Sequence, residues 1–225
     1  MSNPLNVSIK SEIPSILLLT SALIASPFFY KHFPQRVPIH WDANGQVNGW
    51  GSPVFAAFFF PVLLLAIYLL LIFIPKFDPH AERYPDFAKS YQIIKSGIIG
   101  FLVLIYFFAS FNALGFNIPI ATIMPLTIGL LFILIGNYMG KLKLNWFVGA
   151  RTPWTMSSET VWNKTNRLGG KLFFFGGLAM VLEIFIPTQL KFATLMLIVL
   201  IVSFTPFIYS YLAYQQEQKN KKNNS

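Results

Sequence analysis

The sequence predicts an all-α integral membrane protein with six transmembrane helices, and three observations support this fold class. Charged residues make up only 11% of the 225 residues, against roughly 25% in an ordinary soluble domain. The mean hydropathy is +0.57, so the charges are too few to cover a water-facing surface. Six separate stretches are also apolar and long enough to cross a bilayer, which takes about 20 residues.

The six apolar stretches are predicted to be the membrane-spanning helices. They lie at residues 13–30, 53–75, 93–115, 118–138, 170–187 and 192–214. The first resembles the apolar core of a signal peptide, but cleavage after Ser26 would place bulky Ile24 and then Pro27 at the positions that signal peptidase reads, so we interpret it as a retained helix. Prolines inside the stretches are expected to kink the helices. They are Pro27, Pro61, Pro125 and Pro206.

The distribution of Lys and Arg predicts the orientation in the membrane. If both termini are cytoplasmic, 14 of the 17 cations lie on the cytoplasmic side and three on the outer side. Loops on the cytoplasmic side of a membrane collect Lys and Arg. We therefore expect a multi-pass protein of the cytoplasmic membrane with both termini inside. The same rule explains the net charge of +9 without direct binding to nucleic acid.

The first loop, residues 31–52, is expected to form a small extracytoplasmic cap. Its two Asn-Gly pairs, at 44–45 and 48–49, are turn signals between short apolar segments, a pattern typical of a hairpin. Trp41 and Trp50 would anchor the cap at the membrane surface. His32, His40 and Asp42 could suggest zinc, but their spacing fits no closed site and the chain has no cysteine, so we expect no metal and no cofactor.

The remaining parts of the chain divide into two units and a tail. We expect an N-terminal three-helix unit at residues 1–115, a second three-helix unit at 116–214, and a disordered basic tail at 215–225. The connection at 75–95 has mixed charge, with a turn at Asp78-Pro79 followed by a short amphipathic helix on the membrane surface. Its charges are interpreted as solvated.

Glu183 is predicted to lie within the fifth span. It follows Gly170 by thirteen residues, or about 20 Å of helix, which places it in the outer part of the membrane. An intramembrane carboxylate is a candidate functional group by default. A structural role remains open, in which Glu183 is protonated or paired with Lys191, His32 or His40. No second acid falls within the other predicted spans, so no pair of carboxylates is expected.

The polar stretch GARTPWTMSSETVWNKTNR at 149–167 is predicted to be a cytoplasmic elbow. Thr152-Pro153 favours an extended turn, and Ser157 or Ser158 is suited to cap a helix whose first turn holds Glu159. That helix would lie amphipathically at the lipid interface and lead through Gly169-Gly170 into the fifth span. Asn163, Lys164, Asn166 and Arg167 would form its polar face, while Gly136 and Gly140 would allow close helix packing.

Residues 136–171 resemble the signature region of the SdpI/YfhL family of bacterial membrane immunity proteins. Gly136 and Asn137, the core Gly-x-Arg-Thr-Pro-Trp-Thr at 149–155 and the later Trp and Asn-Arg carry this resemblance. The functional motif comprises Asn137, Asn145, Gly149, Arg151, Thr152, Pro153, Trp154, Thr155, Trp162, Asn166 and Arg167. The first loop, from Val37 to Ser52, resembles the uncharacterised N-terminal membrane domain that many members carry. Its candidate residues are His40, Trp41, Asp42, Gly45 and Trp50.

The resemblance implies a non-enzymatic immunity protein that protects the cell against a secreted peptide toxin. The toxin would be met at the outer face, and a transcriptional repressor could be held at the cytoplasmic face. Arg151 is expected to be the polar anchor of the elbow, bonding backbone carbonyls or lipid phosphate. Three alternatives remain. One is a transporter or lipid-binding protein that uses Glu183, another is a structural assembly factor, and the third is a membrane enzyme, for which Ser157, Ser158 and Glu159 have only His80 on the same side.

Overall fold

A computed structural model describes residues 4–5 and 9–223, and within them six long helices have the length and apolar character needed to cross a membrane. Their segments are α1 (Ile9–His32), α2 (Phe60–Phe73), α3 (Tyr84–Ala113), α4 (Ile120–Met139), α6 (Glu159–Leu182) and α7 (Thr188–Asn223). A π-helical turn, η1 (Phe55–Phe59), leads into α2. The all-α, six-helix prediction is confirmed.

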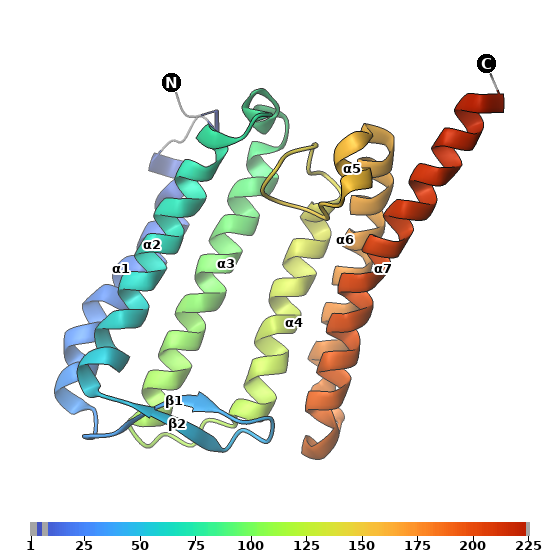
Figure 1. Ribbon diagram of the computed structural model, residues 1–225. Helices are drawn as coiled ribbons and strands as arrows, with labels where there is room; N and C mark the ends of the chain where they lie inside the picture. Colours follow the sequence, from blue (N-terminus) through green and yellow to red (C-terminus); the bar gives the residue numbers. More distant parts are fainter. Residues whose placement is uncertain (1–3, 6–8, 224–225) are drawn as a thin grey trace.

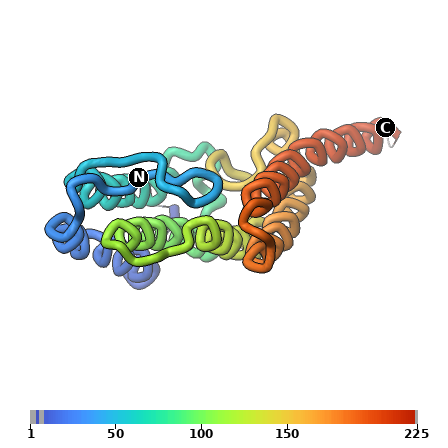
Figure 2. Tube along the Cα trace, turned by 90° about the horizontal axis from the view of Figure 1, so that it is seen from below, coloured from blue at the N-terminus to red at the C-terminus, as the bar shows by residue number. Residues whose placement is uncertain are grey.

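The helices stand side by side in a row of two groups (Figure 1). Helices α1, α2 and α3 form one group, and α4, α6 and α7 form the other, with α4 next to the first group, as the view along the helices also shows (Figure 2). A two-stranded hairpin, β1 (Val37–Trp41) and β2 (Val47–Gly51), crosses one end of the row. We call this the hairpin end, and the opposite end, which carries the short helix α5 (Pro153–Ser157), the motif end.

The hairpin confirms the predicted cap and corrects one of its turns. The strands are antiparallel and pair Val37 with Gly51 and Trp41 with Val47, with an irregular register near His40. Asn44-Gly45 forms the turn, but Asn48-Gly49 lies inside β2 and not at a second turn. The reason is that Asp42 Oδ1 accepts hydrogen bonds from the amides of Asn44 and Gln46, and this fixes the first turn in place.

Two segments predicted to be separate are joined to their neighbouring helices. The expected surface helix after Ala81 is a 3-10 turn, η3 (Ala81–Arg83), that runs directly into α3, whose only non-helical residue is Phe87. Tyr84, Phe87 and Tyr91 are buried, so their packing draws this segment into the bundle. The predicted interfacial helix at the elbow is likewise the first part of α6 and continues into its membrane span.

The C-terminal tail predicted to be disordered is helical as far as Asn223. Its polar residues extend α7, and adding residues to an existing helix avoids the unfavourable nucleation step. Glu217 lies 3.0 Å from the amine of Lys221, one turn further along the helix. Ser158 Oγ also donates a hydrogen bond to Glu217 Oε2 at 2.6 Å, which fastens the extension to the motif end.

A glycine seam holds α4 against α6. Gly129 faces Gly177, and Gly136 faces Gly170, so the two helix backbones meet directly. A Cβ atom at Gly177 would lie 2.5 Å from the carbonyl oxygen of Gly129. Small residues permit this approach between membrane helices, and the predicted role of Gly136 in close packing is confirmed.

A buried ion pair joins α1 to α3 and was not expected. Helix α1 begins at Ile9, so Glu12 lies inside it and is 3% exposed, while Lys95 is 1% exposed. Lys95 Nζ lies 2.5 Å and 2.6 Å from the two carboxylate oxygens, and Tyr68 of α2 donates a third hydrogen bond at 2.9 Å. The prediction that no second acid lies in a span is therefore wrong.

Candidate functional site

At the motif end, Asn145 folds the loop between α4 and α5 around its side chain. Its Oδ1 accepts hydrogen bonds from the amides of Phe147 and Val148, and its Nδ2 donates to the carbonyls of Lys143 and Val148. Asn145 is fully buried. A single amide side chain thus satisfies backbone groups that the loop cannot pair with one another.

Trp162 and Asn166, one turn apart on α6, hold the same loop from beneath. Trp162 Nε1 donates to the carbonyl of Leu142 at 2.8 Å, and Asn166 Oδ1 accepts from the amide of Ala150 at 2.8 Å. Asn166 is 1% exposed, so its predicted place on a polar surface is wrong. Gly149 lies against both side chains at a φ of 119°, where a Cβ would come 2.7 Å from Asn166 Oδ1.

The Thr-Pro-Trp-Thr segment caps α5 and fastens it to α7. Thr152 and Thr155 form a capping box, each side chain bonding the other's backbone amide, and Pro153 occupies the first turn. Thr152 Oγ1 also donates to Ser210 Oγ of α7 at 2.9 Å. Trp154 packs edge-to-face on Phe207 and Tyr211 of α7, with ring centres 5.4 Å and 5.1 Å away.

Asp78 connects the motif loop to the first helix group, a role that was not predicted from the sequence. Its carboxylate is buried and accepts hydrogen bonds from the hydroxyl of Tyr84 at 2.8 Å and from the amide of Trp146 at 2.9 Å. Arg151 then donates to the carbonyl of Trp146 at 2.5 Å. The only sequence signal was that Asp78 precedes a proline, which indicated a turn and not a contact 68 residues away.

The outward surface of the motif end is made by a few exposed side chains. Arg151, Arg167 and Asn137 are exposed, and Trp146 is 52% exposed. Glu159 is also exposed and pairs with Arg83 from the first helix group. The motif therefore divides into buried residues that build the loop and residues that are exposed on its surface.

At the hairpin end, the turn reaches across to α4. A Cβ atom at Gly45, whose φ is 78°, would lie 2.9 Å from the backbone nitrogen of Ala121 in the first turn of α4. Trp50 is about half exposed and stacks near the guanidinium of Arg36, which lies 5.5 Å from its ring centre. His40 Nδ1 lies 2.5 Å from Asn48 Oδ1. The hairpin is thus a strap from α1 and α2 to α4.

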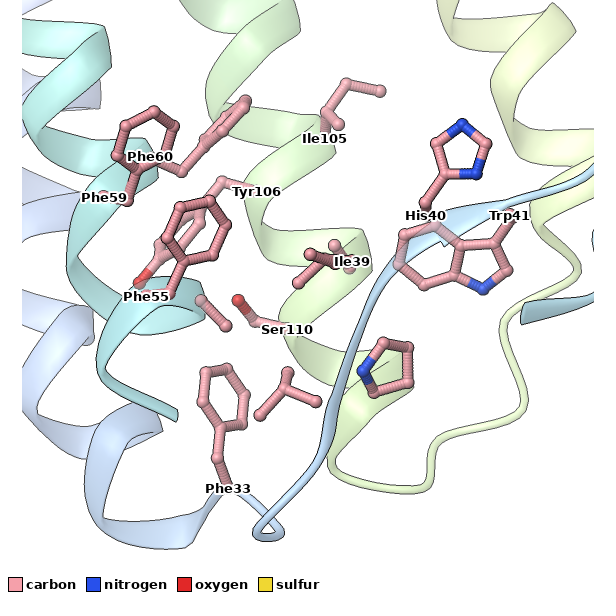
Figure 3. Close-up of a pocket in the computed structure, with 14 residues that line it drawn as sticks. Phe33, Ile39, His40, Trp41, Phe55, Phe59, Phe60, Ile105, Tyr106 and Ser110 are labelled. Carbon is pink, nitrogen blue, oxygen red and sulfur yellow. The ribbon is translucent and has the colours of Figure 1, made fainter. Parts of the chain in front are cut away.

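Two apolar cavities lie under this strap. The first has a volume of about 400 Å³ and lies between α2, α3 and β1, where Ile39 faces Tyr106 and Ser110 while Phe55 and Phe60 close the other side (Figure 3). The second, of about 570 Å³, lies between α3, α4, α7 and the hairpin. His40 and Trp41 line both cavities, and Asp42 and Lys191 line the second. Volumes of this size are typical of ligand sites.

Glu183 does not line either cavity. It directly follows α6 near the hairpin end, is 1% exposed, and neither of its carboxylate oxygens has a hydrogen-bond partner among the described residues. Of the three groups suggested as partners, Lys191 is near enough to attract it electrostatically but forms no ion pair with it. His32 and His40 bond elsewhere, to the carbonyl of Phe28 and to Asn48.

These features define an all-α, multi-pass membrane protein. Two apolar cavities lie beneath a hairpin at one end of the bundle, and a loop fixed by hydrogen bonds lies at the other. Residues 141–210 match the model of the SdpI/YfhL protein family, and residues 17–65 match that of a domain of unknown function (DUF1648). The chain is 25% identical to the "Immunity protein SdpI" of Bacillus subtilis (strain 168) over 207 residues, which cover 92% of this chain and 97% of the relative. No solved structure matches the chain. The resemblance predicted from the motif is confirmed.

Proposed function

We propose that this protein is a membrane immunity protein that protects its cell against a secreted peptide toxin. The observation that carries the proposal is the similarity to an immunity protein along almost the full length of both chains. It includes the hairpin and the motif loop, so both ends of the bundle are shared. No bound group and no nucleophile with a base is needed for this role, and the protein acts as a binding protein.

The hairpin end is the face that would meet the toxin. Under the positive-inside rule it is the outer end, because the segments that carry 14 of the 17 cations adjoin the opposite end. A peptide arriving from outside encounters the exposed Trp50, the strap and the cavity mouths first. Trp41 and His40 lie at both cavities, which makes them the candidate contact residues.

The motif end would hold a transcriptional repressor at the membrane. The buried motif residues give the loop a fixed shape, and they leave Trp146, Arg151 and Arg167 exposed on it. An aromatic side chain beside arginines is the composition typical of protein interfaces. The partner is then a cytoplasmic protein with a complementary acidic and apolar surface.

The alternative of a transporter or lipid-binding protein that uses Glu183 needs a cavity that reaches this carboxylate from outside. Neither of the two cavities at the hairpin end is lined by Glu183, which is 1% exposed. The immunity role therefore fits the structure better than transport through Glu183.

The test is a toxin challenge of sensitive cells that express the full chain, using peptide toxins encoded beside its gene. Wild-type protein should raise the toxin concentration that kills half of the cells. Gly45→Ala should lower this protection, because it strains a positive φ and displaces the strap from Ala121. Gly115→Ala is the matched control, since Gly115 has a φ of 93° but no atom within 4 Å of the added Cβ. No protection by the wild type against any of these toxins would disprove the immunity role.

A second arm addresses the repressor. Repressor candidates from the same genomic neighbourhood should cofractionate with membranes that contain the wild type after toxin is added. Arg151→Ala should release them while leaving protection intact, and Lys171→Ala, which removes an exposed cation of α6 outside the motif, should not. Retention that is unaffected by Arg151→Ala would rule out the proposed docking surface.

The proposed orientation can be tested with single cysteines, because the chain has none of its own. A cysteine at Asn48 in the hairpin should react with a membrane-impermeant thiol reagent in intact cells, and one at Ser157 in the motif end should react only after lysis. The reverse labelling pattern would show that the proposed orientation is wrong.

A further inference from the structure

The second cavity under the strap contains a buried cation without an anion. Lys191 is 5% exposed and lies in the first turn of α7. Its Nζ donates to Thr122 Oγ1 of α4 at 2.7 Å, and it forms no ion pair with a carboxylate in the part of the chain that the structure describes. An ammonium group has three donors, and a buried charge in a membrane protein is costly unless it is paired.

The other charged groups near this cavity do not neutralise the cation. Asp42 lines the cavity but forms no ion pair with Lys191, and its Oδ1 accepts hydrogen bonds from the amides of Asn44 and Gln46 in the hairpin turn. Glu183 attracts Lys191 from a distance without a direct contact. The ammonium therefore retains donors for an anionic group at the cavity.

Below this cation, the cavity is apolar and follows the helix axes. Its walls include Ile105 of α3, Ile128 of α4 and Leu195 of α7. Ile120, at the start of α4, lines the cavity eight residues before Ile128, so the walls extend about 12 Å along this helix. An apolar chain running parallel to the helices fits this shape, with its polar end at the level of Lys191.

We propose that the second cavity binds an anionic phospholipid from the leaflet at the hairpin end, with one acyl chain between α3, α4 and α7 and its phosphate at Lys191. The site is independent of the proposed immunity role, because it rests on the cavity and the unpaired cation alone. Phosphate is the anion that a compact ammonium group binds as a point charge, and the cavity volume of about 570 Å³ suits one chain.

The experiment is native mass spectrometry of the purified full chain in detergent with equal amounts of phosphatidylglycerol and phosphatidylcholine of identical chains. Wild-type protein should retain mainly one phosphatidylglycerol. Lys191→Gln should reduce this retention about tenfold, the loss expected for a hydrogen bond to a charged group. Lys31→Gln, which removes an exposed cation at the same end of the bundle, is the matched control and should retain the lipid.

Two further variants keep the proposal testable if Lys191→Gln does not fold. Ala109 lines both cavities, so Ala109→Phe should fill the space and abolish retention of phosphatidylglycerol. Glu183→Gln should leave retention unchanged, because Glu183 forms no ion pair with Lys191 and lines neither cavity. Retention that Ala109→Phe leaves unaltered, or that Glu183→Gln abolishes, would overturn the proposal.

Three other results would also overturn it. Equal retention of the two lipids by the wild type would mean that the site does not distinguish an anionic headgroup from a zwitterionic one. An equal loss in Lys31→Gln would assign the effect to surface charge and not to the cavity. Displacement of phosphatidylglycerol by an equimolar amount of oleate would assign the site to a free fatty acid and not to a phospholipid.

Discussion

The two helix groups are held together by opposite means. In the first group, α1, α2 and α3 meet through side chains, with the Glu12–Lys95 ion pair at one level and rings such as Phe29 and Tyr106, 5.7 Å apart, at another. In the second, α4 and α6 meet through backbones at the glycine seam. Because lipid offers little hydrophobic force between helices, each group relies on a specific contact that a random apolar surface would lack.

The difference predicts how each group fails. A side-chain contact can be removed and replaced, so a paired substitution in the first group can restore stability. Where two helix backbones touch, there is no side chain that can be replaced to make room. Even one added methyl group therefore disrupts the packing of the second group.

The largest effect is expected for Lys95→Met. It leaves Glu12 as an uncompensated buried charge, which typically costs about 3–5 kcal/mol of unfolding free energy. Unfolding in mixed detergent micelles with increasing dodecyl sulfate measures this loss. The double variant Glu12→Leu with Lys95→Met should recover much of the lost stability, and a double variant no more stable than the single would contradict the account.

The next effect is expected for Gly177→Ala in the glycine seam. The new Cβ would lie 2.5 Å from the Gly129 carbonyl oxygen and 2.8 Å from the Ile133 nitrogen, both backbone atoms that can move only with the helix. We expect a loss of about 1–3 kcal/mol in the same assay. Gly100→Ala is the control, because the nearest atom to its Cβ is Leu18 Cδ1 at 3.5 Å, and it should be neutral or slightly stabilising.

An effect of similar size, but confined to one loop, is expected for Asn145→Ala at the motif end. It leaves the amides of Phe147 and Val148 without their acceptor, at about 1–3 kcal/mol for unsatisfied buried groups. Hydrogen exchange should show faster exchange at these two amides. Asn163→Ala, on the exposed side of α6, should leave both amides protected. Equal protection in the two variants would show that Asn145 does not hold the loop in its conformation.

The smallest effect is expected for Ser210→Ala, which removes the acceptor of the Thr152 hydroxyl. A single neutral hydrogen bond contributes about 0.5–1.5 kcal/mol. The change should appear as a slightly lower unfolding midpoint, while Ser203→Ala, exposed on the same helix, should have no effect. A loss of unfolding free energy as large as that of Gly177→Ala would contradict this prediction, because one neutral hydrogen bond between α5 and α7 cannot account for it.

The sequence predicted the features that depend on neighbouring residues. Apolar length identified six spans, and Asn44-Gly45 identified the hairpin turn, since each signal lies within one element. The motif residues were found by their order, yet their division into buried and exposed ones was not. Asn166 appeared polar on a helical face, but its amide is buried because it satisfies the backbone of Ala150.

The contacts missed from the sequence join residues far apart in the chain. Glu12 and Lys95 are 83 residues apart and lie at the polar edges of apolar stretches, where charges ordinarily face water. The helical extension of α7 was missed because its Gln, Lys and Asn residues match the composition of a disordered tail. Composition does not record that a preceding helix supplies the nucleus for further turns.

Helix α7 is longer than the membrane is thick, and it connects the two ends of the bundle without a break. Its 36 residues span about 54 Å, well beyond the roughly 30 Å of the hydrocarbon core. Lys191 at its beginning and Glu217 near its end are separated by about 39 Å of continuous helix. Pro206 is buried between them, and its ring lies 3.8 Å from the position of a Cβ at Gly169 of α6. A rigid tilt of α7 about this contact would therefore move the Lys191 end and the Glu217 end of the helix in opposite directions.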